Sequence, residues 1–499
     1  MREWDAQRLA EAAGARLASP PGGEPGQGPG PSGAGVDTRA LAPGELFVGL
    51  AGAHVDGGRF AARALRAGAW GVLVAPEHAP AAAAQGGGAV LVHEDPLLAL
   101  HALALAWRRE LRARGAKLVA ITGSTGKTST KDILAALLRA AGLRVAASPA
   151  NHNTEIGMPL ALLGAAADTQ ALVLELAMRG PGQIAQLTAI AEPDVGVIVN
   201  LGPAHLGLLG SLEAIAAAKA ELIAGLEPGA CAVLPAGEPL LAPHLRADVR
   251  TISFGEGGDV RLVERREAPP PDGEAPRPGG GTGWVTVDHG GERIELRPSF
   301  AQAHNLRNLL AAVAAARALG ITPHGPLEVS FSAMRGQRER LAGGVQLIDD
   351  CYNANPMSMR AALDELAASA PGRRVAVLGD MLELGPQAPA LHREIGEHAA
   401  RAGVRLLVTV GPLAAQMAAG FAGETRAAAD AREAGELVAR LVRDGDTVLV
   451  KASRGVGLER VVERLRAGPA GGGAGPAGGG AGETAGGGAR ARAAGAGRR

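Results

Sequence analysis

The sequence predicts an α/β protein of three domains. We expect a central doubly wound parallel sheet with a phosphate-binding loop, flanked by a small N-terminal α/β domain and a C-terminal Rossmann-like domain. The length of 499 residues corresponds to about three domains of roughly 150 residues each. Short apolar runs at 46–50, 71–74, 117–122, 171–174, 195–200, 374–378, 406–410 and 447–450 alternate with helical stretches. This alternation is typical of parallel sheets built from β–α–β units.

Clusters of glycine and proline suggest where the domains begin and end. We place the N-terminal domain at 1–114, with a flexible insertion at 20–35, the central domain at 115–342 and the C-terminal domain at 343–466. A further cluster at 255–283 predicts a surface loop or hairpin. Residues 467–499 are almost entirely Gly, Ala and Arg, too few apolar side chains to form a core, so we expect a disordered tail.

The composition excludes several classes of protein. Lys plus Arg and Asp plus Glu both total 50, and this balance argues against a general nucleic-acid binder. Two cysteines, Cys231 and Cys351, are too few for a disulfide scaffold and fit a reducing cytoplasm. The sequence contains no run of 18 apolar residues, so we expect no membrane-spanning helix. We therefore expect a cytoplasmic protein with no nucleic-acid partner and no membrane insertion.

The strongest local signal is the segment ITGSTGKT at 121–128, which lies between a predicted buried strand and a predicted helix at 128–141. Its glycines allow a tight turn that aims backbone N–H groups at phosphate oxygens, and the helix N-terminus adds a positive dipole end. The loop is two residues shorter than the common Walker pattern. The candidate ATP contacts are Gly123, Ser124, Thr125, Gly126, Lys127, Thr128 and Ser129.

Three polar residues follow this loop in the same predicted domain. Glu175 ends a strand, His205 lies just beyond the next strand, and Lys219 lies in an alanine-rich helical stretch. A strand-end carboxylate beside a phosphate loop is a natural Mg²⁺ ligand, because ligands bind at the carboxyl ends of parallel strands. Taken singly, each has an ordinary explanation: a turn glutamate, a structural histidine and an exposed helix lysine.

Together, these residues and their flanking motifs resemble the Mur ligase family of ATP-dependent amide-forming enzymes. The segments are TGSTGKTST at 122–130, the strand-end glutamate, NLGPAHL at 200–206 and AKAEL at 218–222. Later segments resemble the family member that adds D-alanyl-D-alanine, namely QAHNLRN at 302–308, DDCYNANP at 349–356 and LGDMLELG at 378–385. The resemblance extends from residue 36 to about residue 465.

The resemblance implies a reaction and its cofactors. ATP would phosphorylate the terminal carboxylate of UDP-N-acetylmuramoyl-tripeptide, and the amine of D-alanyl-D-alanine would attack the acyl phosphate. Two Mg²⁺ ions and Lys127 would neutralise the meeting anions. Thr128 and Glu175 would hold one ion and His205 the second, with Lys219 as a carbamylated ligand. We expect a monomer, and the third residue of the tripeptide, diaminopimelate or lysine, stays open.

The resemblance also implies contacts for the nucleotide and the substrate. His304, Asn305 and Asn308 would contact ATP, Asp350 its ribose, and Tyr352, Asn353 and Asn355 would line the pocket. Arg335 would contact phosphate, with Arg338 as the alternative. The substrate-binding candidates are Thr38, Arg39, Asn151, Asn153, Thr154, Lys451, Ser453 and Arg454.

Three alternative functions fit the sequence less well. Another family member, such as the ligase for the third-position amino acid or folylpolyglutamate synthetase, would lack the YNANP and GDMLELG segments. A non-catalytic nucleotide-binding protein would be expected to lose Lys127, Glu175 or His205. An ATPase that powers a conformational cycle would leave the motifs of the outer domains unexplained.

Overall fold

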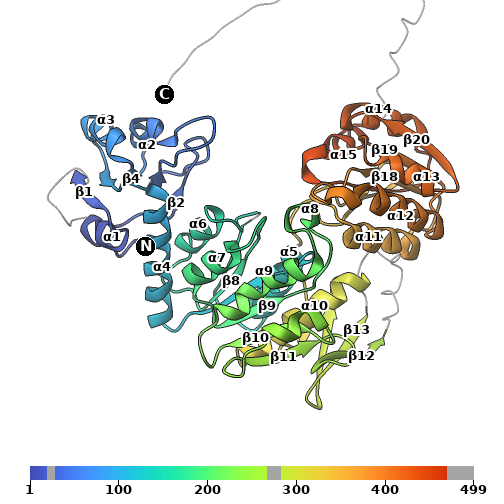
Figure 1. Cartoon of the computed structure of the whole chain (residues 1–499), viewed down its shortest axis with the longest axis horizontal. Helices are drawn as coiled ribbons and strands as arrows, with labels where there is room; N and C mark the ends of the chain where they lie inside the picture. Colours follow the sequence, from blue (N-terminus) through green and yellow to red (C-terminus); the bar gives the residue numbers. More distant parts are fainter. Residues whose placement is uncertain (20–28, 150, 267–282, 469–499) are drawn as a thin grey trace, which may run out of the picture.

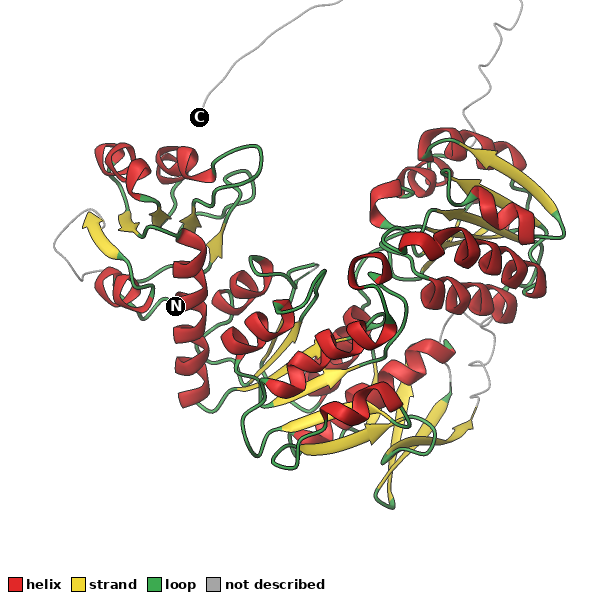
Figure 2. Cartoon of the chain, viewed as in Figure 1, coloured by secondary structure: helices red, strands yellow, loops and turns green. Residues whose placement is uncertain are grey.

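The computed structural model describes residues 1–19, 29–149, 151–266 and 283–468, and it contains three sheet-centred units (Figure 1). The N-terminal and C-terminal units lie at opposite ends of the central one, and helices cover the sheets in all three (Figure 2). The predicted α/β fold class is therefore confirmed. The predicted tail falls almost entirely outside the described residues.

The N-terminal unit has a five-stranded sheet in the order β1-β5-β4-β3-β2. All neighbours are parallel except β1 and β5. Its elements are α1 (Ala6–Ala12), β1 (Arg16–Ser19), β2 (Ala34–Gly35), β3 (Leu46–Val48), α2 (Ala61–Arg66), β4 (Gly71–Val74), α3 (Ala79–Gln85), β5 (Ala89–Val92) and α4 (Pro96–Ala113).

The flexible insertion expected at 20–35 needs a correction at its C-terminal end. Residues 20–28 lie outside the described part of the chain, but 29–35 are packed against the N-terminal unit. The Gly30 amide donates to the Arg2 carbonyl at 2.7 Å, and the Trp70 indole donates to the Pro29 carbonyl at 2.9 Å. The cluster of glycines and prolines concealed these contacts, because composition carries no information on tertiary partners.

The central unit has a ten-stranded sheet in the order β15-β14-β13-β12-β11-β10-β9-β6-β8-β7. The strands are β6 (Lys117–Thr122), β7 (Val145–Ala147), β8 (Ala171–Glu175), β9 (Val195–Ile198), β10 (Cys231–Pro235), β11 (Arg250–Phe254), β12 (Val260–Arg266), β13 (Trp284–His289), β14 (Glu292–Pro298) and β15 (Gly325–Leu327). The helices are α5 (Lys127–Ala140), α6 (Gly157–Leu163), α7 (Gln183–Ala191), α8 (Leu206–Leu209), α9 (Leu212–Ala224) and α10 (Ala303–Ala318).

The strands from β7 to β11 are parallel, as predicted. The sheet then continues as an antiparallel meander through β12, β13 and β14. Strand β12 lies within 255–283 and pairs antiparallel with β13, in agreement with the hairpin that is one of the two forms predicted there. Strand β6 lies between β8 and β9, with its sequence successor β7 at the sheet edge. This reversal of strand order opens a crevice at the carboxyl ends of the strands, where open α/β sheets bind ligands.

The C-terminal unit has a six-stranded sheet in the order β16-β17-β21-β18-β19-β20, parallel except at β16. Its elements are β16 (Gln337–Arg340), β17 (Gln346–Asp349), α11 (Pro356–Ser369), β18 (Arg374–Gly379), α12 (Ala388–Arg401), β19 (Leu406–Val410), α13 (Ala415–Gly420), β20 (Glu424–Ala428), α14 (Ala431–Leu441), β21 (Thr447–Lys451) and α15 (Glu459–Arg466). This sheet begins at β16, before residue 343, where we expected the third domain to start.

The N-terminal and central units share one buried apolar cluster. It includes Trp4, Leu46 and Leu91 from the first unit and Leu118 and Leu172 from the second. Helix α4 forms the bridge, since it packs against α6 and α7 of the central unit. The buried clusters of the C-terminal unit contain only residues of that unit and of the segment that leads into it. The first two units are thus joined by a hydrophobic core, and the third is joined differently.

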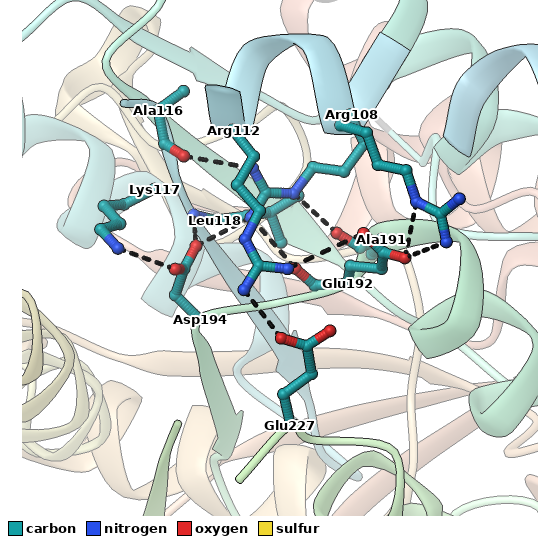
Figure 3. A network of polar contacts seen from close by, with 10 residues as sticks. Arg108, Arg112, Ala116, Lys117, Leu118, Ala191, Glu192, Asp194 and Glu227 are labelled. Carbon is teal, nitrogen blue, oxygen red and sulfur yellow. Dashed lines mark hydrogen bonds and ion pairs between the residues drawn. The ribbon is translucent and has the colours of Figure 1, made fainter. Parts of the chain in front are cut away.

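A buried arginine reinforces the junction between α4 and the central sheet (Figure 3). Arg108 is completely buried. Its guanidinium donates to the carbonyl oxygens of Ala191 at 2.9 Å, Ala116 at 3.1 Å and Glu192 at 3.0 Å, and to the Asp194 carboxylate at 2.8 Å. Every partner lies in the central unit or at its entry, so this one side chain fixes the end of α4 to the sheet.

No helix in the described ranges is both long enough and apolar enough to span a membrane.

The buried contacts of Arg108 at the junction predict that Arg108→Ala strongly destabilises the protein. Three carbonyl groups would lose their buried donor, and we expect the free energy of unfolding to fall by about 3–5 kcal/mol. Urea unfolding measures this change, with tryptophan fluorescence as the readout, because Trp4 and Trp107 pack in the shared cluster. Arg109→Ala is the matched control: Arg109 is 63% exposed and pairs with Glu192 on the surface, so its loss should cost at most about 1 kcal/mol. Equal losses for the two variants would contradict the role given to Arg108.

Candidate active site

The phosphate loop connects β6 to α5 at the reversal point of the central sheet. Two of its glycines adopt positive φ angles, 151° at Gly123 and 76° at Gly126. At Gly126 a side chain is also excluded by contact, because a Cβ atom would lie 2.5 Å from Asn308 Oδ1 on α10. The start of α10, where Asn308 is a predicted ATP contact, therefore lies directly against the loop.

Thr128 and Glu175 form the first half of the site. The Thr128 hydroxyl donates to Glu175 Oε2 at 2.8 Å, and both residues are buried. The other carboxylate oxygen of Glu175 accepts from the Asn153 side-chain amide at 2.9 Å. The Glu175 backbone amide donates to Ser148 Oγ at 3.1 Å. The strand end, the loop and the helix start thus position one hydroxyl and one carboxylate side by side.

Three basic side chains converge on the same edge of the sheet. Burial lowers the pKa of Lys127, opposed by Glu175 and assisted by Arg335. Burial also lowers the pKa of Lys219 well below its usual value, and the Lys127 charge lowers it further. The pKa of His205 is lowered by burial, against the effect of Glu383, and by the charges of both lysines. These mutual effects indicate that the predicted catalytic residues lie in one electrostatic neighbourhood.

Lys219 does not have the exposed position typical of a helix lysine. It is 2% exposed on α9, between buried Ala218 and Ala220. Its burial favours the neutral amine, which is the form that reacts with CO₂ to give a carbamate. The chemistry of this environment therefore fits the carbamylation that the resemblance implies.

Residues that lead into or belong to the C-terminal unit complete the site. Arg335 Nη2 donates to the Thr128 hydroxyl at 3.1 Å, and its guanidinium stacks 3.9 Å from the centre of the Tyr352 ring. The Asn355 side-chain amide approaches the Ser124 carbonyl at 3.4 Å. Arg338 instead pairs with Glu365 and Ser369. Of the two arginines left open by the sequence, the structure therefore brings Arg335 to the phosphate loop.

The remaining nucleotide candidates lie around the start of α10. Asn305 and Asn308 are buried there, and the Asn308 amide donates to Asn305 Oδ1 at 3.3 Å. Burial lowers the pKa of His304, while Asp350 raises it and Lys451 lowers it. The charges of Asp350 and Lys451, in the C-terminal unit, therefore act on His304 in the central unit.

All three C-terminal substrate candidates have side-chain partners within the described chain, and Arg454 donates to the Met334 sulfur at 3.1 Å. Lys451 is 2% exposed and donates to the Asp350 carboxylate at 2.6 Å and the Asn353 carbonyl at 2.9 Å. The buried Ser453 hydroxyl donates to the Ala354 carbonyl at 3.3 Å. Arg454 is exposed, 5.9 Å from the Tyr352 ring centre. In this arrangement Lys451 holds one of the two carboxylate oxygens of Asp350.

The other substrate candidates lie in two places. Thr38 and Arg39 belong to the N-terminal unit, where Arg39 is 80% exposed on its side chain and pairs with Asp37 at 2.6 Å. Asn153 contacts Glu175, as described above. Asn151 is exposed next to it, and the Thr154 hydroxyl accepts from the Gly157 amide at 3.3 Å at the start of α6. The loop before α6 therefore adjoins the phosphate loop, whereas Thr38 and Arg39 approach from a separate domain.

Three residues that organise the site were not predicted from the sequence. Asn200 accepts from the Thr125 amide at 2.9 Å and donates to its hydroxyl at 3.0 Å. Ser148 supports the backbone of Glu175, and Glu383 contacts His205 Nδ1 from the C-terminal unit. Asn200 follows β9 as Glu175 ends β8, so the strand-end signal could have identified it. The partner of His205 had no local signal.

The donor set fits Mg²⁺. Mg²⁺ prefers hard oxygen ligands, and the Thr128 hydroxyl and the Glu175 carboxylate supply two of them in contact. Both are buried beside the cationic Lys127 and Arg335, which would pair with phosphate oxygens. A nucleotide phosphate and Mg²⁺ would therefore share the end of the phosphate loop, with His205 and Lys219 beside them.

Comparison with known proteins agrees with this site. The description "Mur ligase middle domain" matches residues 121–316, and "Mur ligase, glutamate ligase domain" matches residues 334–454. The UDP-N-acetylmuramoyl-tripeptide–D-alanyl-D-alanine ligase of Synechocystis sp. is 37% identical over 87% of this chain and 91% of its own length. The enzyme of the same name from Bacillus subtilis is 33% identical over 88% of this chain and 93% of its own.

Solved structures give the same result. A crystal structure of MurF from Acinetobacter baumannii superposes with a TM-score of 0.78 at 28% identity, covering 93% of this chain and 99% of that one. The MurF ligase from Thermotoga maritima in complex with ADP gives 0.71 at 29% identity, covering 87% and 97%. With two domain matches, close relatives over most of its length and a shared three-domain structure, the chain belongs to the Mur ligase family.

Proposed function

We propose that this protein adds D-alanyl-D-alanine to UDP-N-acetylmuramoyl-tripeptide at the expense of ATP, yielding UDP-N-acetylmuramoyl-pentapeptide, ADP and phosphate. The observation that carries this proposal is the buried Thr128–Glu175 pair at the phosphate loop, met by Arg335 from the edge of the C-terminal unit. The named activity of relatives 32–38% identical over most of the chain supports it. It is a step in the synthesis of peptidoglycan precursors.

The chemistry requires two anions to meet. The terminal carboxylate of the tripeptide attacks the γ-phosphorus of ATP, the bond to the β–γ bridging oxygen breaks, and ADP leaves. The amine of D-alanyl-D-alanine then attacks the acyl carbon, loses a proton, and expels phosphate as the amide forms. Lys127 and Arg335 would reduce the repulsion between phosphate and carboxylate. When bound, Mg²⁺ neutralises phosphate charge; Thr128 and Glu175 would hold one ion, and His205 and carbamylated Lys219 a second.

The remaining predicted contacts fall into two groups, one for the nucleotide and one for the substrates. His304, Asn305, Asn308, Tyr352, Asn353 and Asn355 would surround the adenosine half of ATP, because they lie around the junction of the central and C-terminal units. Thr38 and Arg39 would meet the uridine end of the substrate, and Asn151, Asn153 and Thr154 its muramoyl part. Arg454 is the exposed C-terminal candidate for the incoming dipeptide.

We place the reaction in the cytoplasm, where ATP is supplied and where thiols stay reduced, as both Cys231 and Cys351 are free. We propose that the protein acts as a monomer, since one chain provides every group named above. Assay with tripeptides that end in diaminopimelate and in lysine decides which of the two it uses.

The ligase reaction predicts strict coupling. Purified protein mixed with ATP, Mg²⁺ and UDP-muramoyl-tripeptide should release phosphate in multiple turnovers only when D-alanyl-D-alanine is added. Lys127→Ala should lower the rate by about 10²–10³-fold, because it removes a cation from the phosphate site. Lys117→Ala is the control, since Lys117 is 58% exposed at the opposite end of the same strand. Phosphate release that does not depend on the dipeptide would contradict the ligase function.

The carbamate at Lys219 has a separate test. Lys219→Ala should lose activity, because an anionic ligand disappears from a buried position. Short carboxylic acids, such as acetate, should then partly restore the rate by supplying a carboxylate in the space of the missing side chain. Lys127→Ala should show no such rescue. Failure of rescue at Lys219 would count against the carbamate and leave the ligase function in place.

The mode of attachment of the C-terminal unit predicts a closing motion. This unit contacts the central one through polar groups, and such contacts exchange partners more readily than a shared core. Small-angle X-ray scattering should show a smaller radius of gyration with a non-hydrolysable ATP analogue and UDP-muramoyl-tripeptide than without ligands. An unchanged radius would contradict the closure.

A further inference from the structure

The ring of His205 is not oriented by its own helix. His205 has a left-handed backbone, with φ 61°, and it precedes the four-residue helix α8, to which its side chain gives no capping hydrogen bond. The orientation of the ring is therefore left to contacts outside α8.

That outside contact comes from the other domain. Glu383, in the loop after β18, contacts His205 Nδ1 through Oε2. The other charged groups around this pair are Lys127 and Lys219, which act on His205, and Arg179, which lies 3.9 Å from Glu383. A carboxylate on one imidazole nitrogen fixes the ring plane and the tautomer, and leaves the other nitrogen, Nε2, for a ligand.

The backbone around Glu383 is built to hold this contact. Glu383 is also left-handed, with φ 62°, and its carbonyl accepts from the Gly207 amide at 2.8 Å. Gly207 and Gly385 meet face to face: a Cβ atom on Gly385 would lie 2.8 Å from Gly207 Cα. The absence of side chains at both positions lets α8 and the 383–385 loop touch. We call this contact, formed by His205, Gly207, Glu383 and Gly385, the α8 joint.

We propose that Glu383 is a positioning residue for the second Mg²⁺ site, and that the α8 joint makes His205 ready for the ion only when the C-terminal unit is docked. The proposal rests on the function proposed above, in which His205 binds that ion. The proposal gives a role to the GDMLELG segment, which contains Glu383 and to which no phosphate or substrate contact is assigned. It also links metal binding to domain position through one hydrogen-bonded pair.

The test measures metal binding directly, with Mn²⁺ in place of Mg²⁺. Titration of the full-length protein with Mn²⁺, in the presence of a non-hydrolysable ATP analogue and UDP-muramoyl-tripeptide, is followed by electron paramagnetic resonance of the free ion. Wild type should bind two ions. Glu383→Gln should bind the first normally and the second about 10–100-fold more weakly, the usual loss when the outer partner of a metal-binding histidine is removed. The Mg²⁺ concentration for half-maximal rate should rise in parallel, with the KM for ATP within about twofold of wild type.

Two further variants separate the positioning role from a general disturbance. Gly385→Ala changes no charge but inserts a methyl group into the α8 joint. It should also weaken binding of the second ion. Glu394→Gln removes an exposed glutamate of the same domain, paired with Arg360 on the surface at 3.3 Å, and it should bind both ions as wild type does.

The outcomes are distinguishable. A wild type that binds one ion would overturn the metal assignment of His205 and, with it, this proposal. A wild type with two ions and a Glu383→Gln variant with unchanged affinity would overturn the positioning role alone. Tighter binding by Glu383→Gln would also overturn it, because Glu383 would then compete with the metal for His205. Normal binding by Gly385→Ala would refute the dependence on docking of the C-terminal unit.

Discussion

Strand β6 lies between β8 and β9, so the polypeptide segments that follow these three strands meet at one edge of the central sheet. The phosphate loop follows the first, Glu175 ends the second, and Asn200 and His205 follow the third. Parallel strands present all their carboxyl ends on the same side, and the reversal of strand order opens space there. The groups proposed to act on the phosphates of ATP are positioned by this arrangement or are delivered to it from the edge of the C-terminal unit.

The two outer domains are attached by different forces, and this difference fits their roles. The N-terminal unit shares a hydrophobic cluster with the central unit, and the buried Arg108 satisfies carbonyl groups across the junction. Separation of these two units would expose apolar surface and leave hydrogen-bond acceptors without donors, so the junction resists bending. The C-terminal unit instead supplies Arg335 and Asn355 to polar partners at the phosphate loop, and Glu383 to His205. The domain proposed to bind the uridine end is thus held by a shared core, and the domain proposed to close over ATP is held by polar contacts.

Much of the site could be predicted because its chemistry is local in sequence. The phosphate loop needs glycines, a lysine and a helix start within eight residues, and a strand-end glutamate is visible in an apolar run. The prediction failed where geometry depends on distant chain segments. The cluster of glycines and prolines predicts a flexible insertion at 20–35, yet Pro29 and Gly30 are held by Trp70 and Arg2. The strands β13 and β14 were not predicted, because their pairing partners lie outside any single local pattern.

The sequence by itself determined the fold class, the phosphate loop, the order of the acidic and basic residues along the chain, and membership in the family. These properties follow from periodicity and from motifs of a few adjacent residues. Only the tertiary structure brought Arg335 rather than Arg338 to the phosphate loop, buried Lys219 near the charge of Lys127, and joined Glu383 to His205, which lies 178 positions earlier in the chain. Partners so far apart in the chain leave no pattern in either local segment, because their contact is created by the packing of domains.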